Sequence, residues 1–448
     1  MEKAGVRLMT QGTIWKHIVA FAIPVFIGNL FQQMYNTADS LIVGNFLGSN
    51  ALAAVSSSGN LIFLMVGFFN GVFIGAGVII ARYFGAQRFD LMQKAIHTTV
   101  ALGIVSGIVM SIVGVFLAPI ILVWMGTPQN VMPESVTYFQ IYFLGSLGFI
   151  LYNAGVGILQ ALGDAKHPLY YLIISSIINV VLDILFVAGF KMGVGSAAAA
   201  TVISQFISAI LCMQRLIRTK AVYRLDIKKI SFDKEMLGMI ISYGLPAGLQ
   251  NSIIALANVV VQSNINSFGE MAMAGCGAYS KIEGFAFLPI TSFCMALTTF
   301  VGQNLGAAQY ERTIKGTKFG IICSIILAES VGVLMFIFAP QLIAAFNNNP
   351  QVIHYGMMRA RTSAFFFCLL AYSHCISAIL RGAGKSKVPM LVMMIFWCVV
   401  RVTFLTLAMS VDHRIDFVYW VYPLTWSLSS IVFYYYYHNV DWMHNFEV

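Results

Sequence analysis

Two carboxylates stand in apolar segments, where ionisable residues are costly. Residues 176–189, SIINVVLDILFVAG, are apolar apart from a serine, Asn179 and Asp183. An acid at the centre of a membrane-spanning helix costs about 2.5–3.5 kcal/mol on insertion-derived scales. Asn179 precedes Asp183 by four residues, so both side chains lie on one helical face. A second acid, Asp39, follows a run of polar residues in the first apolar segment. These acids are candidates for a function that requires their charge.

Oxygen ligands from neighbouring segments could complete an ion site around the two acids. Carboxylate, amide and hydroxyl oxygens suit a proton or a small hard cation such as Na⁺. Desolvation and a second carboxylate nearby both favour the protonated form of an acid. The alternative is that each aspartate is neutralised by a buried partner and has no further role. The predicted ion-coupling residues are Asp39, Asp183, Asn179, Thr201 and Asn153, and the first four would hold Na⁺ if that is the ion.

Amide side chains mark one face of the first and seventh apolar segments. They recur at spacings of three and four, and such a face points at other helices or a water-filled cavity rather than at lipid. Hydrogen bonds between helices explain the amides equally well. The first segment carries Asn29, Gln32, Gln33, Asn36 and Ser40, and the seventh carries Asn251, Asn258 and Gln262. An acid in the eighth segment could attract a cation or pair with another helix. The predicted substrate-cleft residues are Gln33, Asn36, Asn258, Gln262 and Glu283.

The composition is that of a polytopic membrane protein. The chain has 448 residues, of which 59% are hydrophobic and only 10% are charged, and no soluble globular protein needs so few charges. The net charge of +9 is spread over short clusters between apolar segments, which argues against nucleic-acid binding. The seven cysteines are scattered without a CxxC pair, so we expect neither disulfides nor a metal site.

Twelve apolar segments are long enough to cross a bilayer, which needs roughly twenty residues each. The loops on one side carry most of the lysines and arginines, among them Lys3, Arg7 and the stretch 215–234. By the positive-inside rule, both termini are therefore expected in the cytoplasm of a bacterial or archaeal-type plasma membrane. We find no cleaved signal peptide. The predicted spans are residues 14–40, 51–81, 95–123, 136–162, 168–190, 194–217, 236–266, 271–301, 316–346, 353–380, 387–409 and 415–438.

The sequence contains an internal repeat. FGAQRFDLMQKA (84–95) matches LGAAQYERTIKG (305–316), and LQALGDAKHP (159–168) matches LRGAGKSKVP (380–389), both at a shift of 221 residues. Each half therefore has six spans and enters the membrane in the same orientation, which predicts an all-α fold of two lobes related by a pseudo-two-fold axis along the membrane normal. The predicted lobes are residues 1–217 and 236–448. Residues 218–235 are the basic cytoplasmic linker, a tether or a contact for anionic lipid headgroups.

The aspartates Asp39 and Asp183 have no acidic counterparts in the second half. Shifted by 221 residues, Asp39 falls on Val260, Asn179 on Val400 and Asp183 on Phe404. If a six-helix lobe needed the acids to fold, both halves should carry them. Their restriction to one half favours a function specific to that half.

Motifs of membrane-embedded enzymes are missing from the sequence. It contains no HExxH, P-loop or G-x-S-x-G motif, so we expect no catalytic residues and no enzymatic activity. No nucleotide-binding domain accompanies the spans, so transport would draw on an ion gradient and need no cofactor beyond H⁺ or Na⁺. A channel function is an alternative, although two repeats with intramembrane acids in only one of them are typical of transport by alternating access. We expect a functional monomer.

The chain resembles the multidrug and toxic compound extrusion (MATE) family over essentially its whole length. The resemblance lies in PVFIGNLFQQMYNTADSLIVGNFLGSNALAAVS (24–56), RYFGAQRFD (82–90) and VGQNLGAAQYE (301–311). NVVLD (179–183) followed by GVGSAAAAT (193–201) resembles the branch around DNA-damage-inducible and archaeal members.

The resemblance implies two six-helix lobes around a central cleft, and export of organic, often cationic or amphipathic, compounds in exchange for H⁺ or Na⁺. It also implies that the family's coupling residues fall on Asp39, Asn179, Asp183 and Thr201, with Asn153 a further match. Other branches place a coupling acid in the eighth span, where Glu283 is the nearest match. A flippase for lipid-linked precursors on the same scaffold is the alternative, and a sensor or channel without coupled transport is a third.

Overall fold

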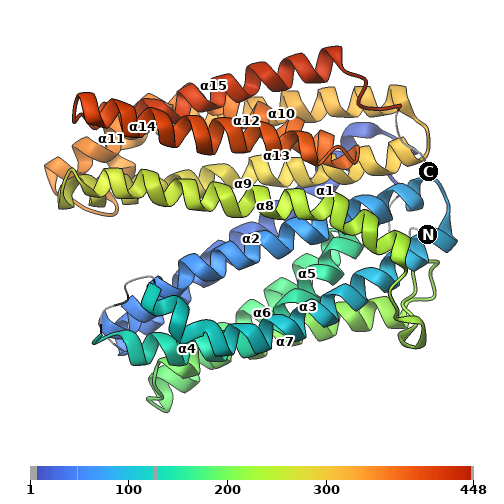
Figure 1. The fold of residues 1–448 in the computed structure, drawn as a ribbon, viewed down its shortest axis with the longest axis horizontal. Helices are drawn as coiled ribbons and strands as arrows, with labels where there is room; N and C mark the ends of the chain where they lie inside the picture. Colours follow the sequence, from blue (N-terminus) through green and yellow to red (C-terminus); the bar gives the residue numbers. More distant parts are fainter. Residues whose placement is uncertain (1–7, 48, 125–126, 128, 445–448) are drawn as a thin grey trace. The chain divides into compact units, whose positions relative to one another are not determined.

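The computed structural model describes residues 8–47, 49–124, 127 and 129–444. The side chains of residues 40, 41, 44, 49, 50, 52–54, 56–61, 63 and 64 lie outside this description, and so do Lys3, Arg7 and the side chain of Ser40 named above. The described chain is helical, with short connections and no strand (Figure 1). The first half contains α1 (Ile14–Leu47), α2 (Ser49–Gly85), α3 (Phe89–Trp124), α4 (Met132–Leu144), α5 (Ser146–Ala161), α6 (Lys166–Asp183), the π-helix η2 (Ile184–Gly189) and α7 (Val194–Arg218).

The second half follows a short 3₁₀ turn in the linker, η3 (Ile227–Lys229). Its helices are α8 (Lys234–Asn266), α9 (Glu270–Gly306), α10 (Tyr310–Ala344), α11 (Pro350–Ala364), α12 (Phe367–Gly382), α13 (Lys387–Met393), the π-helix η4 (Met394–Val400), α14 (Arg401–Val411) and α15 (Asp416–Asn439). Each predicted span is therefore helical.

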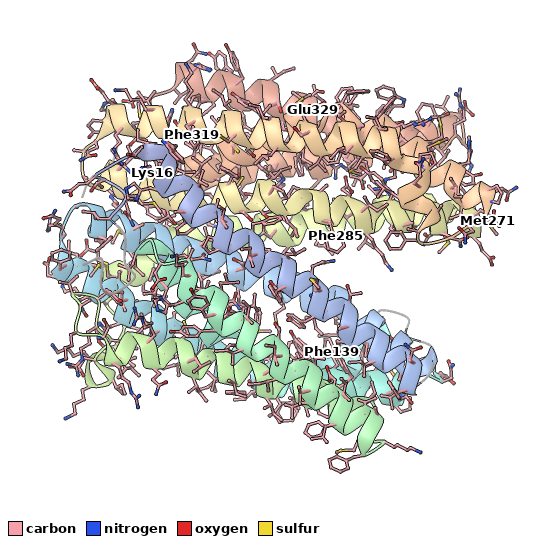
Figure 2. The ribbon with its side chains drawn as sticks, turned by 180° about the vertical axis from the view of Figure 1, so that it is seen from behind. Lys16, Phe139, Met271, Phe285, Phe319 and Glu329 are labelled. Atoms are coloured by element: carbon pink, nitrogen blue, oxygen red, sulfur yellow. The ribbon has the colours of Figure 1, made fainter. Side chains whose placement is uncertain are left out.

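Most of these helices meet the requirements for crossing a membrane. Within the described residues, nine are long and apolar enough, and the bent pairs α4–α5 (47°) and α11–α12 (59°) raise the number to eleven. The twelfth predicted span forms α15, a 24-residue helix rich in tyrosine and tryptophan. Long helices with apolar side chains along their lengths are what a bilayer requires, because every backbone group is then satisfied within its own segment (Figure 2).

The chain divides into two compact units. Among the described residues, unit 1 comprises Leu8 and Ile27–Gly244, and unit 2 comprises Met9–Phe26 and Leu245 onward. These boundaries differ from those of the predicted lobes, because the start of α1 belongs to unit 2 and the linker belongs to unit 1. In unit 1, α5 packs against α2, α3 and α7, and α6 packs against α7. In unit 2, α9 packs against α10, α11 and α12, and α15 packs against α12.

Backbone landmarks recur in both halves at the predicted shift. Gln87 (φ 56°) and Ala308 (φ 55°) are left-handed residues 221 positions apart, and so are Gly163 (φ 80°) and Gly384 (φ 74°). The helix boundaries at Gly85 and Phe89 recur at Gly306 and Tyr310. A left-handed residue ends a helix by turning the chain back on its last carbonyls. The two halves therefore use the same turns to reverse the chain.

The start of the described chain is anchored in unit 2. The guanidinium group of Arg312 donates to the carbonyl oxygens of Met9, Gln11 and Gly12 at 2.7–3.1 Å. The Met9 amide donates to Gln303 Oε1 at 2.8 Å. These bonds hold the segment before α1 at the α9–α10 turn. The first turns of α1 are therefore part of unit 2.

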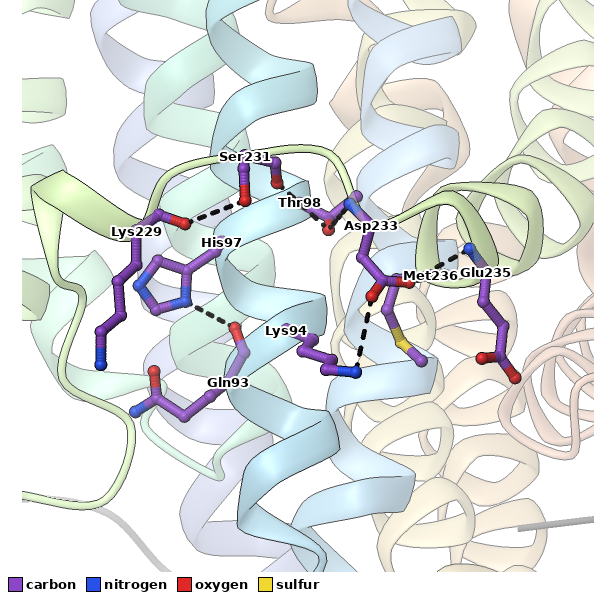
Figure 3. Close-up of polar contacts among 9 residues, drawn as sticks. All are labelled: Gln93, Lys94, His97, Thr98, Lys229, Ser231, Asp233, Glu235 and Met236. Atoms are coloured by element: carbon purple, nitrogen blue, oxygen red, sulfur yellow. Dashed lines mark hydrogen bonds and ion pairs between the residues drawn. The ribbon is translucent and has the colours of Figure 1, made fainter.

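The predicted linker is docked on α3 (Figure 3). Tyr223 and Leu225 are buried (0% and 2% exposed). The Thr98 hydroxyl donates to Ser231 O at 3.5 Å and accepts from the amide of Asp233 at 3.1 Å. The linker is therefore a packed part of unit 1 rather than a free tether.

Neighbouring side chains of α3 extend this docking. The His97 ring accepts from the Asp226 amide through Nε2 (3.1 Å), while its Nδ1 lies 2.6 Å from Gln93 O. Because Nε2 is the acceptor, the Nδ1–H tautomer fits both contacts. Lys94 pairs with Asp233 at 3.6 Å.

Asp233 caps the N-terminal end of α8, and its charge predicts that the stability of the docked linker depends on pH. Its Oδ1 accepts from the amides of Glu235 and Met236 at 3.1 Å, and these bonds, with Lys94 nearby, hold the pKa of the Asp233 carboxyl below its ordinary value of 3.8. Because the pKa of Asp233 is lower in the folded state, its carboxylate stabilises the docked linker at a pH above 3.8. This stabilisation is lost as the pH falls through the folded-state pKa.

We therefore expect Asp233→Ala to loosen the linker, because a lost helix cap costs about 1 kcal/mol, or about a fivefold change in the open population. Trypsin cleavage after Lys228 and Lys229, both exposed, measures this opening. Asp233→Asn is the matched control, since its amide oxygen still caps α8 but carries no charge. Equal cleavage rates for wild type and Asp233→Ala would contradict the docking.

Candidate functional site

The structure brings the two acids of the first half together. Asp39 lies on α1 and Asp183 ends α6, and their carboxyl groups are close enough to interact electrostatically. Asp183 is fully buried (0% exposed) and Asp39 is half-buried. Two ionised carboxylates offer only acceptors, so a hydrogen bond between them requires a proton. The predicted meeting of these acids is therefore present in unit 1.

The acid pair lacks hydrogen-bond donors. Both oxygens of Asp183, Oδ1 of Asp39 and Oδ1 of Asn179 are buried and accept from no other described residue. The ion pairs that the described residues form include neither acid. A buried acceptor left unsatisfied costs about 1–3 kcal/mol, and more when it is charged. A proton or a small cation is the partner that such an oxygen set fits.

Asn179, one helical turn before Asp183 on α6, contacts Thr201 on α7. The Asn179 amide, 1% exposed, donates to Thr201 Oγ1 at 3.4 Å, and that hydroxyl donates to Ala197 O at 3.1 Å. This arrangement joins α6 to α7 and leaves the Asn179 carbonyl oxygen free. The chemistry is that of a hard-oxygen site. No three His, Cys, Asp or Glu side chains converge as a metal centre anywhere in the part of the chain that the structure describes.

A π-helix begins directly after Asp183. The last α-helical residue of α6 is Asp183, and η2 continues the span from Ile184 to Gly189. A π-helical turn inserts extra backbone into the span and often marks a functional site. It changes the direction of the residues that follow, so Asp183 lies where the regular helix ends.

Three tyrosines near the acids were not predicted as site residues. Tyr138 and Tyr142, one turn apart on α4, and Tyr35 on α1 are each close enough to interact electrostatically with Asp39. Tyr142 also accepts from Gln205 at 3.4 Å. The spacing of four between Tyr138 and Tyr142 was the available signal, but aromatic residues are abundant throughout this chain, and most belong to lipid-facing or packing surfaces.

Other predicted residues of the first half lie apart from this contact network. The side-chain amide of Asn153 donates to the backbone oxygen of Phe149, four residues earlier on the same helix, at 2.8 Å. Gln33 is half-buried and its carbonyl oxygen accepts from Thr37. Asn36 is exposed. The predicted roles of these residues remain predictions.

The predicted residues of the second half lie on α8 and α9. Asn258 accepts from Arg401 at 3.3 Å, and Gln262 donates to Asn266 at 2.8 Å. Glu283 is half-buried and accepts from the Tyr279 hydroxyl at 3.1 Å. In the described residues, Arg401 makes no ion pair with Glu329.

Glu329 lies near the middle of α10 (Figure 2) and accepts from the Cys368 amide at 3.0 Å. A hydrogen bond from a backbone amide stabilises an isolated carboxylate. This acid therefore has a structural role where α12 begins.

Comparison with known proteins identifies the family. A family model described as MatE matches residues 24–185 and again residues 246–407. The chain belongs to the MatE family. The two matches begin 222 residues apart (246 against 24), within one residue of the predicted shift, which confirms the internal repeat.

Related proteins carry names of drug transporters. The chain is 27% identical over 98% of both chains to the probable multidrug resistance protein YoeA of Bacillus subtilis. It is 30% identical over 87% of both chains to the probable multidrug resistance protein YpnP of the same organism. It is 25% identical to the probable multidrug resistance protein NorM of Thermotoga maritima, over 85% of this chain and 82% of that one.

Solved structures share the fold. One is described as the outward-facing conformation of a multidrug resistance MATE family transporter of the MOP superfamily, with a TM-score of 0.90 and 23% identity over 96% of both chains. Another, a MOP superfamily transporter from Pyrococcus furiosus, has a TM-score of 0.89 and 24% identity over 96% of both chains. The protein is thus an all-α polytopic membrane protein with the two-lobe fold of this family.

The contact between Asp39 and Asp183 predicts a shared proton in Na⁺-free buffer at neutral pH. The infrared carbonyl band of a protonated carboxyl should be present in the wild type and reduced in Asp183→Asn, because the remaining acid then faces an amide instead of a second acid. Glu329→Gln is the control that removes a different intramembrane acid. An unchanged band in both Asp39→Asn and Asp183→Asn would show that the pair holds no proton.

Proposed function

We propose that the protein is a secondary antiporter that exports organic, often cationic or amphipathic, compounds in exchange for H⁺ or Na⁺. The observation that carries this proposal is the pair Asp39–Asp183, buried in unit 1 with oxygens that lack donors. Such a pair takes up a cation when one is supplied from outside the chain. Names of related proteins, multidrug resistance proteins among them, support the class of substrate.

Coupling follows from the charge of the acid pair. In the ionised state two neighbouring carboxylates repel each other and attract a cationic substrate. Binding of H⁺ or Na⁺ removes the repulsion and changes the charge that the substrate meets. The ion drives export only if its affinity differs between two conformations. The π-helix after Asp183 supports such a difference, since a short non-α segment can shift α6 with little loss of hydrogen bonds.

The remaining properties follow from the class. A transporter of this kind needs no enzymatic activity and no cofactor beyond the coupling ion, and each chain holds a complete acid pair, so we propose a functional monomer. Basic loops on one side favour cytoplasmic termini, and we propose that the protein lies in the plasma membrane of a bacterial or archaeal cell.

Asp183→Asn should reduce efflux of a cationic dye at least tenfold while the variant is expressed and inserted normally, because an amide cannot change charge. Rhodamine 123 efflux from inverted vesicles, with H⁺ and Na⁺ gradients imposed one at a time, measures both the loss and the ion. Glu329→Gln is the matched control: it converts another intramembrane acid to its amide, whose oxygen can still accept from the Cys368 amide, so we expect near wild-type efflux. Wild-type efflux from Asp183→Asn would remove the assignment.

The alternative classes predict different outcomes in the same vesicles. A flippase for lipid-linked precursors would translocate a fluorescent anionic lipid and leave the dye untouched. A sensor or a channel without coupled transport would show no dye movement that follows either gradient.

A further inference from the structure

Two buried arginines of unit 2 lie at positions that correspond, in the repeat, to neighbours of the unit 1 acids rather than to the acids themselves. Arg359 on α11 is 3% exposed and Arg401 at the start of α14 is 1% exposed. At the repeat shift of 221, Tyr138 of unit 1 corresponds to Arg359, and Thr201 corresponds to Tyr422. The same turns of the repeated fold therefore carry neighbours of the acids in one unit and cations in the other.

The two guanidinium groups contact the same aromatic ring. Arg401 Cζ lies 4.5 Å and Arg359 Cζ 5.2 Å from the centre of the Tyr422 ring. Arg359 also stacks on Tyr279 at 4.9 Å and Arg401 on Trp397 at 5.4 Å. Cation–π contacts of this kind attract the face of a guanidinium group. These contacts do not bond the N–H groups, which lie in the plane of the guanidinium group.

Several of these N–H donors have no acceptor. Arg401 donates to Asn258 Oδ1 at 3.3 Å and to Thr425 Oγ1 at 2.9 Å, but its Nε is buried without a described partner. Nε and Nη1 of Arg359 are likewise buried without one. Native proteins satisfy nearly all buried polar groups, and an exception indicates an unseen partner such as a bound ion. The missing partner must be an acceptor.

The charges of the cluster are also unbalanced. Glu283 is the acid that interacts electrostatically with both arginines, but it forms no ion pair with either in the described chain. One carboxylate cannot neutralise two guanidinium groups. Unpaired charge inside a membrane protein is costly, and buried cations are found paired. One further negative charge would balance the cluster.

We propose that Arg359 and Arg401 bind an oxyanion, a carboxylate or a phosphate, between the aromatic rings of unit 2. Guanidinium groups recognise these anions through paired N–H bonds in one plane. The rings of Tyr279, Trp397 and Tyr422 hold the two guanidinium groups in place beside this anion. The π-helix η4 ends at Val400, directly before Arg401, as η2 begins directly after Asp183 in unit 1. Anion binding here does not require that the protein exports cations, so the two proposals fail separately.

Binding of two dyes with one ring system and opposite charges tests the site. Fluorescein carries the carboxylate and rhodamine 123 is cationic, and fluorescence anisotropy with purified protein in nanodiscs measures both. We expect Arg359→Gln and Arg401→Gln each to weaken fluorescein binding at least tenfold while rhodamine 123 binding is retained. Arg361→Gln is the matched control, because it removes the same charge from an exposed position on the same helix. Unchanged fluorescein affinity in folded Arg359→Gln and Arg401→Gln would overturn the proposal.

A second arm uses the wild type and does not depend on whether the variants fold. Excess benzoate should displace fluorescein, and phenyltrimethylammonium, a cation of similar size, should not. Displacement by both or by neither contradicts an anion site. Competition in phosphatidylcholine nanodiscs distinguishes the source. Displacement of fluorescein by short-chain phosphatidylglycerol but not by inorganic phosphate identifies a lipid phosphate as the occupant, and displacement by inorganic phosphate identifies a soluble anion.

Discussion

Water cannot solvate a charge in the core of a bilayer, so each ionisable group there must find its partner in the protein or take one from outside. The contact between Asp39 and Asp183 takes this requirement to its limit. Two acceptor groups meet, and no described residue donates to the fully buried one. The described residues do not provide a donor, so a mobile ion fits these acceptor positions. The ion binding that we propose therefore depends on the approach of Asp39 on α1 to Asp183 on α6.

The two units contain buried, incompletely paired groups of opposite charge. Unit 1 gathers acceptors without donors around Asp183, and unit 2 gathers donors without acceptors around Arg359 and Arg401. In each unit a π-helix adjoins the charged residue. An α-helix alone offers a fixed set of side-chain directions, and the π-helical insertion changes them at this point of the span. The same device serves both kinds of charge.

Much of this could be predicted from the sequence, because hydrophobic length and repeated turn motifs act locally. The twelve helical segments, the repeat and the proximity of Asp39 to Asp183 all follow from such patterns. The burial of Arg359 could not be predicted, because this residue lies near a span end, where a basic residue usually marks the cytoplasmic side of the membrane. The docking of Tyr223 and Leu225 was also missed, because many lysines and arginines around them suggested a solvated tether. The π-helices left no trace in composition or periodicity.

The comparison between the repeats separates what the fold needs from what function needs. Both halves keep the left-handed turns at Gln87 and Ala308, because reversing the chain between two long helices demands that backbone conformation. Neither half keeps the other's charges. A six-helix unit therefore forms with the Asp39–Asp183 pair and without the Arg359–Arg401 pair, or the reverse. Charges that are costly in the membrane and dispensable for folding persist only where another role selects for them. The unsatisfied atoms of each cluster in the described chain are the basis of our proposal that this role is to bind a partner of opposite charge.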